Sequence, residues 1–326
     1  MNQTRKITWL IAHEPVNLFL RTAKAFKEKI AELTDGKFEV EIFTLSEYEA
    51  QFPPRSKKIR DSSLSYKADS MSLLDSEDIQ MSQLHITELA RWHSPEFLAL
   101  EMPFIFKDHD HAARVLEGEI GRKMLDGLVN TSPARGMEFT YSGGFRCLAS
   151  NSPINDLDDV QNVEWATTYN PVTVDTVEAV GAIPKTFSLK EFTSRTTEGL
   201  DSAALETTIP RYLAQYQNTV KKYLINTKHS LFLTSIIIGN KFWATLSEEE
   251  KSKFSEACKY ASRLERKWSV EEAEAFAAKK DHTDIGVIYT ELSANDTEKF
   301  KKAVAPLYDK YRDFFYAGLI DGIIKA

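Results

Sequence analysis

The chain has 326 residues, of which 42% are hydrophobic and 27% charged, and its formal net charge is −7. This length corresponds to about two domains, and the composition is that of a globular protein whose core needs neither disulfides nor metals. The acidic balance argues against nucleic acid and against an anionic membrane surface as partners.

The N-terminal segment lacks the pattern of a secretory signal. Its apolar run over residues 7–12 ends at His13-Glu14, which is too early for the apolar region of a signal peptide. No stretch of the sequence is long enough to span a bilayer. The chain is therefore expected to be either cytoplasmic or a mature form whose signal peptide has been replaced by a start methionine.

The first elements follow the order strand, helix, strand. Residues 6–12 form an apolar run typical of a buried strand, and residues 38–43 alternate between apolar and polar side chains. Between them, apolar residues recur at helical spacing until Thr34-Asp-Gly36 ends the helix: Val16, Leu20, Ala23, Phe26 and Ile30. This unit predicts a parallel sheet in an α/β protein.

The middle of the chain mixes short segments of both kinds. Residues 48–67, with Pro53-Pro54 and a basic cluster over 55–60, predict an exposed connection with a short helix. Residues 102–106 indicate a buried corner. One helix is expected over 109–128, extended chain interrupted by glycine over 139–150, and a second helix over 172–180; the inward side chains of the first would be Ala112, Val115, Leu116, Ile120 and Met124.

A long helix is predicted after Ser247. Ser247 and Glu250 have the spacing of a capping box, and no glycine or proline follows until about His282. Such a helix would extend about 50 Å at 1.5 Å per residue, more than one small lobe can accommodate. Cys147 and Cys258 allow one disulfide, although two inert thiols fit the spacing better.

Catalytic templates are missing from the sequence. It contains no Gly-x-Ser-x-Gly elbow, no phosphate-binding glycine loop and no dinucleotide fingerprint. His109-Asp110-His111 contains metal-ligand types, but adjacent side chains diverge and cannot converge on one ion. We therefore expect a protein that is not an enzyme and holds neither metal nor cofactor.

Several segments match the pattern of a known protein family in their order and spacing. They include Met102-Pro-Phe-Ile-Phe106, Gly143-Gly-Phe-Arg146, the run 152–160, Asn170-Pro171 and 242–247. Together these segments resemble the solute-binding subunits of tripartite ATP-independent periplasmic (TRAP) transporters, of the dicarboxylate type. The resemblance covers most of the chain, from Trp9 to about Leu246, and includes the segment 191–201.

The resemblance implies two α/β lobes with a long helix spanning both, which close over a small-molecule solute. We expect one lobe from residues 1–143 plus 232–268 and the other from 144–231 plus 269–326. It also implies a periplasmic monomer that docks to membrane permease subunits.

One departure from the family pattern is informative. Ala166 occupies the position of an arginine that pairs with the solute carboxylate in most members, and Glu164 stands where a lysine is common. Loss of such a pair would cost about 1.5–3 kcal/mol of binding. Arg146 matches a second family arginine; it either holds a carboxylate or is structural, tied to Asp158 or Asp159.

The remaining candidate ligand-binding residues are acids, aromatic rings and polar side chains. Acids select amine or hydroxyl groups, and aromatic rings can form a wall for a ring or an ammonium group. Each also has a plainer structural interpretation, as a surface acid, a core ring or a structural histidine. With Arg146 they are Glu14, His85, Trp165, Tyr169, Asn170 and Glu206.

These observations favour a carrier for a small solute that is zwitterionic, amine-bearing or hydroxylated. Three alternatives remain open: a carrier of a simple organic acid held by Arg146, a solute sensor, and a cytoplasmic α/β enzyme. The enzyme would have to rely on His85 and the two glutamates, Glu14 and Glu206.

Overall fold

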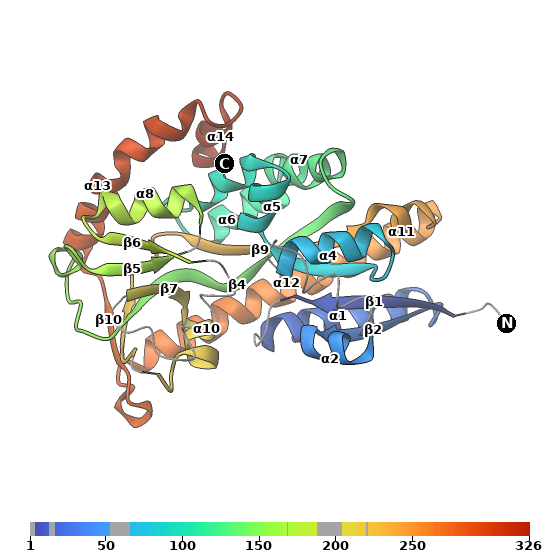
Figure 1. The fold of residues 1–326 in the computed structure, drawn as a ribbon, viewed down its shortest axis with the longest axis horizontal. Coiled ribbons are helices and arrows are strands. Elements are labelled where there is room, and N and C mark those ends of the chain that lie inside the picture. The colour runs from blue at the N-terminus through green and yellow to red at the C-terminus, as the bar shows by residue number, and fades with distance from the viewer. Residues whose placement is uncertain (1–3, 13–16, 53–65, 168, 188–203, 220) are drawn as a thin grey trace. The chain divides into compact units, whose positions relative to one another are not determined.

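The structure of the protein is a computed structural model that describes residues 4–12, 17–52, 66–167, 169–187, 204–219 and 221–326. Glu14, the basic cluster over 55–60 and most of the segment 191–201 lie outside these residues. The chain divides into two compact units (Figure 1). Unit 1 comprises Met1–Ser94, Leu116–Tyr141 and Leu233–Trp268, and unit 2 comprises Pro95–Val115, Ser142–Phe232 and Ser269–Ala326.

This division differs from the expected lobes in residues 95–115, which we placed in the first lobe and which group with unit 2. Two polar contacts hold the segment there. Glu101 pairs with Arg146 at 2.8 Å, and His111 Nε2 lies 2.8 Å from the carbonyl oxygen of Ile323.

Unit 1 opens with the predicted strand, helix and strand. The strand β1 (Arg5–Ile11) pairs in parallel with β2 (Phe38–Thr44), and α1 (Asn17–Leu33) connects them. Beyond β1 the sheet continues with β3 (Met81–His85), parallel to β1, and β9 (Leu231–Gly239), antiparallel to β3. The other helices of this unit are α2 (Leu45–Gln51), α4 (Tyr66–Asp75), α5 (Ile86–Trp92), α7 (Glu119–Gly127), the 3₁₀ turn η2 (Leu128–Asn130) and α11 (Asn240–Ala244).

The core of unit 1 forms where the apolar face of α1 meets the sheet. Phe26 packs against Trp9 at 5.2 Å between ring centroids and against Phe254 at 5.8 Å. Phe38, the first residue of β2, also contacts Phe254 edge-on at 5.0 Å. Burial of such rings supplies most of the stabilisation in a core of this kind, about 1.5–3 kcal/mol for each side chain. The helical and alternating patterns of the sequence therefore correspond to the buried faces of α1 and β2.

Two predictions in the middle of the chain are wrong in part. The helix expected over 109–128 is two helices, α6 (His109–Glu117) and α7, because Gly118 between them is extended, with φ −83° and ψ −171°. Glycine has the largest backbone entropy to lose in a helix, which favours a break there. In addition, Tyr48 is buried in α2, although it begins the segment 48–67 for which an exposed connection with a short helix was expected.

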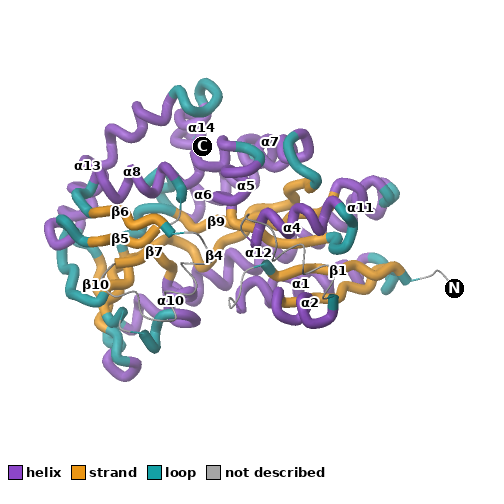
Figure 2. The backbone as a smooth tube through the Cα atoms, viewed as in Figure 1, coloured by secondary structure: helices purple, strands orange, loops and turns teal. Residues whose placement is uncertain are grey.

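Unit 2 contains a second sheet. The long strand β4 (Ala134–Ser150), whose part from Ser142 onward belongs to this unit, pairs antiparallel with β7 (Ala204–Thr208) and β8 (Tyr223–Asn226). The strand β5 (Glu164–Thr167) pairs in parallel with β7, and β6 (Ile183–Thr186) pairs in parallel with β5; Figure 2 shows the three strands side by side. The strand β10 (Ile288–Glu291) pairs in parallel with β8.

Helices cover this second sheet. The helix α8 (Pro171–Ala179) packs on β5 and β6, and α10 (Ile209–Gln215) packs on β7. The predicted helix over 172–180 is thus confirmed as α8. The remaining elements are η1 (Pro95–Glu101), η3 (Asp158–Val160), η4 (Thr283–Ile285), α13 (Ala294–Arg312) and α14 (Leu319–Lys325).

The predicted long helix is present as α12 (Glu248–Lys279), which has 32 residues. Its capping box forms as expected: the backbone N–H of Glu250 donates to Ser247 Oγ at 3.2 Å, and the N–H of Ser247 donates to Glu250 Oε2 at 2.7 Å. The helix contributes Phe254 and Ala261 to the core of unit 1 and Phe276 to that of unit 2. One helix therefore supplies side chains to both cores.

Both cysteines are buried and remain separate thiols, Cys147 in unit 2 and Cys258 in unit 1. Burial raises the pKa of each thiol, so neither forms the reactive thiolate readily. The expectation of two inert thiols agrees with this arrangement.

Candidate functional site

The site begins at the two glycines of β4. Gly143 and Gly144 adopt φ of +94° and +90°, a region that other residues rarely enter. A Cβ atom on Gly143 would lie 2.2 Å from Thr208 Oγ1, which itself donates a hydrogen bond to the Ser142 carbonyl at 2.7 Å. Gly143 therefore lets β4 approach the start of α10 closely, three residues before Arg146.

Arg146 is held by both its backbone and its side chain. Its N–H donates to the Ser230 carbonyl at 2.8 Å, and its own carbonyl accepts from the N–H of Lys228 at 3.0 Å. Its guanidinium donates from Nη2 to Glu101 Oε1 at 2.8 Å and from Nη1 to Glu206 Oε2 at 3.2 Å. Both terminal nitrogens of the fork thus contact carboxylates of the chain itself.

The pairing of Arg146 with Glu206 follows from strand register. Arg146 lies opposite Thr208, and Leu148 lies opposite Glu206, in the antiparallel pair of β4 and β7. Alternate residues of a strand share one face, so Arg146 and Glu206 are diagonal neighbours within reach of long side chains.

Glu101 reaches the arginine from the end of η1 and is itself held by Asn170. The amide nitrogen Nδ2 of Asn170 donates to Glu101 Oε2. The amide oxygen of the same side chain caps α8, accepting from the N–H of Val172 at 3.0 Å. The side chain of Asn170 thus connects the N-terminus of α8 with a buried carboxylate. Asparagine suits this position because its amide group can donate one hydrogen bond and accept another.

Glu206 has a second partner in His229. His229 Nε2 lies 2.8 Å from Glu206 Oε1, and His229 Nδ1 lies 2.7 Å from Thr227 Oγ1. The imidazole stacks on Phe300 at 5.5 Å between centroids, and Trp165 contacts it edge-on at 5.9 Å. Trp165 is therefore a buried wall of this cluster.

The cluster of Arg146, Glu101, Glu206, His229 and Asn170, which we call the arginine cluster, has a surplus of acid. It contains one guanidinium and two carboxylates. Burial by itself raises the pKa of Glu206, but the charge of Arg146 and the hydrogen bonds from His229 and Arg146 outweigh it, so that the pKa lies below its usual value. Glu206 is accordingly ionised at neutral pH.

Two hydrogen-bond donors of this region have no partner among the described residues: Arg146 Nε and Trp165 Nε1, both buried. Buried donors in proteins are nearly always satisfied, so both donors require an acceptor beyond those of the described residues. Both residues contact the arginine cluster, Arg146 as its centre and Trp165 through His229.

A second arginine lies beside the first and was missed by the sequence analysis. The Cζ atoms of Arg146 and Arg211 lie 4.0 Å and 5.1 Å from the ring centroid of Phe232. Arg211 donates to Ser142 Oγ at 3.2 Å and to Gln215 Oε1 at 3.4 Å, and among the described residues it has no carboxylate partner. Burial, and then the charge of Arg146, lower its pKa from the ordinary value.

Other candidates lie apart from the arginine cluster. His85 belongs to unit 1, where it is buried at the start of α5 and its ring meets that of Phe19 edge-on at 6.4 Å. Tyr169, next to Asn170, is half exposed (50%). Ala166 is fully buried in an apolar cluster with Cys147 and Leu205.

The structural partners expected for Arg146 were wrong. Asp158 pairs with Lys299 at 3.2 Å, and Asp159 accepts a hydrogen bond from the N–H of Asn155 at 2.8 Å. These aspartates lie around η3, whereas Glu101 and Glu206 are the acids that β4 and β7 bring to the guanidinium. Among the described residues no group of three or more metal-ligating side chains forms a metal site.

Solved structures with the same fold are solute-binding proteins. The sugar acid binding protein DctPAm from Advenella mimigardefordensis, in complex with galactonate, matches with a TM-score of 0.82 and 21% identity over 100% of this chain and 98% of that chain. A TRAP periplasmic solute-binding protein from Sulfurospirillum deleyianum, with bound succinate, has a TM-score of 0.80 and 22% identity over 98% of each chain. The chain therefore has the two-lobed α/β fold of TRAP periplasmic binding proteins.

Sequence comparison gives the family. The family model described as bacterial extracellular solute-binding protein, family 7, matches residues 12–313. The C4-dicarboxylate-binding periplasmic protein DctP of Rhodobacter capsulatus is 22% identical over 93% of this chain and 85% of its own length. The sialic acid-binding periplasmic protein SiaP of Vibrio cholerae is 25% identical over 72% of this chain and 70% of its own length.

The chain belongs to this family of periplasmic solute-binding proteins of TRAP transporters, which are binding components and not enzymes. The resemblance seen in the sequence is thereby confirmed. In the part of the chain that the structure describes, no helix is long and apolar enough to cross a membrane.

Glu101, His229 and Arg211 are functional candidates that the sequence analysis did not find. Only Arg211 leaves a local signal: it is the third residue of α10, and a cation in the first turn opposes the helix dipole. The sequence around Glu101 and around His229 contains no motif that marks a functional residue. Only tertiary contacts bring the two side chains into the arginine cluster.

Proposed function

We propose that this protein captures a small polar organic solute in the periplasm and delivers it to the membrane permease subunits of a TRAP transporter. Membership of the family supports this role. The solute would be zwitterionic, amine-bearing or hydroxylated, and the arginine cluster would be part of its binding site. The observation that carries the solute class is the neutralisation of Arg146 by two buried glutamates.

Electrostatics explains why this cluster disfavours a plain dianion. A guanidinium whose two ends already contact carboxylates has no free fork for a bidentate pair with a solute acid. A second anion would also meet the carboxylates of Glu101 and Glu206 at low dielectric, where repulsion between like charges is strong. An ammonium or hydroxyl group can instead donate to the glutamates, and a solute oxygen can accept from Arg146 Nε, which has no acceptor among the described residues.

The other predicted residues would have subordinate roles. Asn170 would keep Glu101 in place, Trp165 would form a wall behind His229, and Tyr169 would offer an exposed ring. Roles for Glu14 and His85 stay predictions, since Glu14 lies outside the described residues and His85 belongs to unit 1.

A second candidate solute is a simple organic acid, the alternative raised by the sequence. Arg146 as its sole anchor is disfavoured by its two carboxylate partners, but Arg211 supplies a guanidinium that contacts no carboxylate in the part of the chain that the structure describes. Relatives are named for binding C4-dicarboxylates and sialic acid. A solute with one carboxylate at Arg211 and with hydroxyl or amine groups at Glu101 and Glu206 would belong to both of the proposed solute classes.

A thermal-shift panel on the full chain tests the solute class. The panel would contain succinate, galactonate, glycine betaine, neutral amino acids and neutral polyols. We expect stabilisation by amine-bearing or hydroxylated compounds and little by succinate. Strong stabilisation by succinate, with none by the amines, sugar acids or polyols, would refute the proposed class.

Two variants locate the site. In Glu206→Gln one of the two carboxylates disappears, so binding of anionic compounds should improve while binding of amines weakens. In Arg211→Met only the compounds with a carboxylate should lose affinity. Glu41→Gln, which alters an exposed pair with Lys6 in unit 1, and Arg312→Met, which alters an exposed pair with Asp321, are matched controls that should bind like the parent chain.

Delivery requires its own test. Membrane vesicles containing the permease subunits should accumulate a radiolabelled hit of the panel only when the purified chain is added. Solute binding without any uptake would favour the alternative of a solute sensor.

A further inference from the structure

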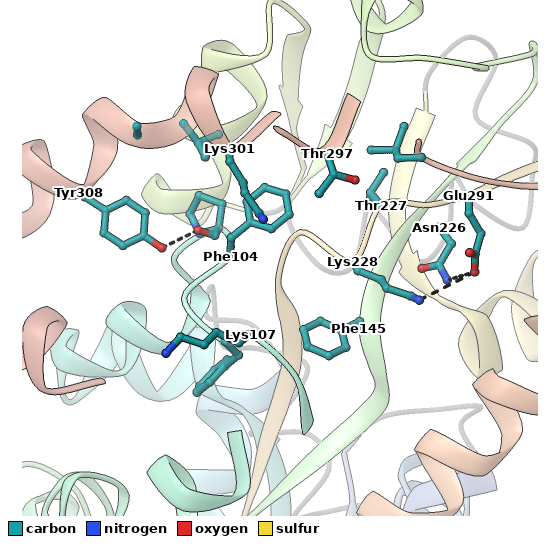
Figure 3. A pocket seen from close by; sticks show the side chains of 15 residues that line it. Phe104, Lys107, Phe145, Asn226, Thr227, Lys228, Glu291, Thr297, Lys301 and Tyr308 are labelled. Carbon is teal, nitrogen blue, oxygen red and sulfur yellow. Dashed lines mark hydrogen bonds and ion pairs between the residues drawn. The ribbon is translucent and has the colours of Figure 1, made fainter. Parts of the chain in front are cut away.

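Unit 2 contains a cavity of about 740 Å³ that does not involve the arginine cluster. It is lined by the segment 103–107, by residues 226–228 at the end of β8 and just after it, by the end of β10 and by one face of α13 (Figure 3). This volume lies within the range of sites for small molecules, about 300–1,000 Å³.

Strand geometry separates the cavity from the guanidinium of Arg146. Phe145 lines the cavity, and Arg146 is its neighbour on the extended strand β4. Successive side chains of a strand point to opposite faces. Arg146 Nη1 and Nη2 accordingly contact Glu206 and Glu101, which do not line the cavity.

The walls of the cavity are largely apolar. Phe104, Phe106 and Phe145 contribute aromatic rings, and α13 presents Val304 and Tyr308. Along α13 the lining residues follow the spacing of a single helix face: Thr297, Lys301, Val304 and Tyr308. Tyr308 is fixed by a hydrogen bond from its hydroxyl to the Pro103 carbonyl at 2.7 Å.

The charges on the cavity wall are mainly positive. Three lysines and one glutamate line it, which sums to two positive charges in a chain of net charge −7. Lys107 Nζ contacts only the Ile324 carbonyl among its described partners, at 3.3 Å, and Lys228 Nζ lies 3.8 Å from Glu291 Oε1. Lys301 pairs with Glu298 at 2.7 Å, and its Nζ lies 5.9 Å from the centroid of the Phe104 ring. Exposed pairs of this kind are weak, so an anion can compete for the ammonium groups.

Two wall residues adopt a backbone conformation that is unfavourable for their type. Phe104 has φ +59° and Lys228 has φ +48°, both in the left-handed region. Local contacts hold them there: the N–H of Phe104 donates to the His229 carbonyl at 2.5 Å, and that of Lys228 donates to the Arg146 carbonyl at 3.0 Å. Such outliers cluster at functional sites because strain persists only where the surroundings impose it.

We propose that this cavity is a second ligand site, which takes an amphipathic monoanion: an apolar body, aromatic or alkyl, with one carboxylate or sulfonate. The body lies against the phenylalanine rings and Val304, and the anionic group contacts Lys228 or Lys301. The apolar walls argue against a polyol or a dicarboxylate as ligand, because both would leave polar groups unsatisfied there.

Titration of the full chain with the fluorescent sulfonate 8-anilinonaphthalene-1-sulfonate tests the proposal. We expect one saturable site with enhanced fluorescence. Lys228→Met/Lys301→Met should weaken it at least about tenfold, the loss of about one charge-assisted contact. Ala305→Trp, which fills the cavity from α13, should abolish it.

Lys302 supplies the matched controls, since it lies on the same helix, is exposed and does not line the cavity. Lys302→Met and Lys302→Trp should bind the probe like the parent chain. Far-ultraviolet circular dichroism and the thermal midpoint check that each variant folds. Unchanged probe binding in folded Ala305→Trp, or equal weakening by the Lys302 variants, would overturn the proposal.

Displacement of the probe by other compounds distinguishes an aromatic from an alkyl body of the ligand. Phenylacetate and decanoate represent aromatic and alkyl carboxylates, and decanol is the uncharged control. At least one carboxylate should displace the probe; displacement by decanol at the same concentration as decanoate would contradict an anion site. This experiment is independent of the solute panel, so failure of one proposal leaves the other to its own test.

Discussion

Arg146 and Glu206 lie diagonally across the antiparallel strands β4 and β7, with Nη1 of the arginine 3.2 Å from Oε2 of the glutamate and both side chains buried. The arginine that would be expected to receive a solute acid is thus already paired inside the protein. A buried pair of this kind is costly to break by removal of one partner, about 3–5 kcal/mol, because the other charge is left uncompensated.

Glu206→Gln should lower the free energy of unfolding at pH 7 by about 2–3 kcal/mol, since the amide keeps the shape but not the charge. The effect should depend on pH. The folded-state pKa of Glu206 lies below its usual value, so its ionised form stabilises the fold above the unfolded pKa of about 4.3. This stabilisation is lost as the pH falls through the lower folded pKa.

Urea unfolding at pH 7 and at pH 3 measures this effect. Stability of the parent chain should fall more steeply between the two values than that of Glu206→Gln. Glu41→Gln, in an exposed pair with Lys6, should change the stability at pH 7 by at most about 1 kcal/mol. Parallel pH profiles for Glu206→Gln and the parent chain would contradict the assignment.

Asn170→Asp separates the two contacts of Asn170. Aspartate caps a helix as well as asparagine does, so the cap on the N–H of Val172 should survive. It cannot donate to Glu101, however, and it brings a second carboxylate to that position. We therefore expect Asn170→Asp to lower the thermal midpoint at least as much as Asn170→Ala. If Asn170→Asp proves as stable as the parent chain, the contact with Glu101 is not important for the fold.

Gly143→Ala and Gly144→Ala form a matched pair. Both positions have similar positive φ, so both alanines incur backbone strain of about 1–3 kcal/mol. Only at Gly143 does the new Cβ collide with a neighbour, 2.2 Å from Thr208 Oγ1, whereas at Gly144 the nearest atom is 3.7 Å away. Gly143→Ala should be the more destabilising by at least about 1 kcal/mol in chemical unfolding. Equal losses would show that β4 can move away from α10.

Lys228→Asn and Lys228→Val separate backbone strain from charge in the cavity of unit 2. Asparagine tolerates positive φ, whereas a β-branched residue at φ +48° does not. Lys228→Val should therefore unfold at lower denaturant concentration, with a loss of about 1–2 kcal/mol relative to Lys228→Asn. Both variants lack the ammonium group and should bind 8-anilinonaphthalene-1-sulfonate equally weakly; different affinities would argue against a role for the charge.

Local sequence patterns predicted much of the secondary structure. The alternation over 38–43 and the helical spacing before it gave β2 and α1, because each element buries one face and the pattern records which face. The capping box at Ser247 gave the start of α12. The failure at 109–128 has an equally local cause, since one glycine, Gly118, decided between one helix and two.

The candidate site was only partly accessible to such arguments. Arg146, Glu206, Asn170 and Trp165 were singled out from the sequence, and the structure brings all four to one cluster in unit 2. Their role as ligand-binding residues stays a prediction. The expected partners of Arg146, Asp158 and Asp159, were wrong, because its actual partners Glu101 and Glu206 lie 45 and 60 residues away along the chain and reach it only through the fold.

By itself the amino-acid sequence determined most of the elements, the glycine interruption within β4 and the family, since propensity, periodicity and motif order are properties of neighbouring residues. Only the tertiary structure decided which charge each buried group meets. Strand register put Glu206 diagonal to Arg146, and the fold of the 95–115 segment brought in Glu101. Ion pairing depends on distances through space, and residues far apart along the chain acquire those distances only when it folds.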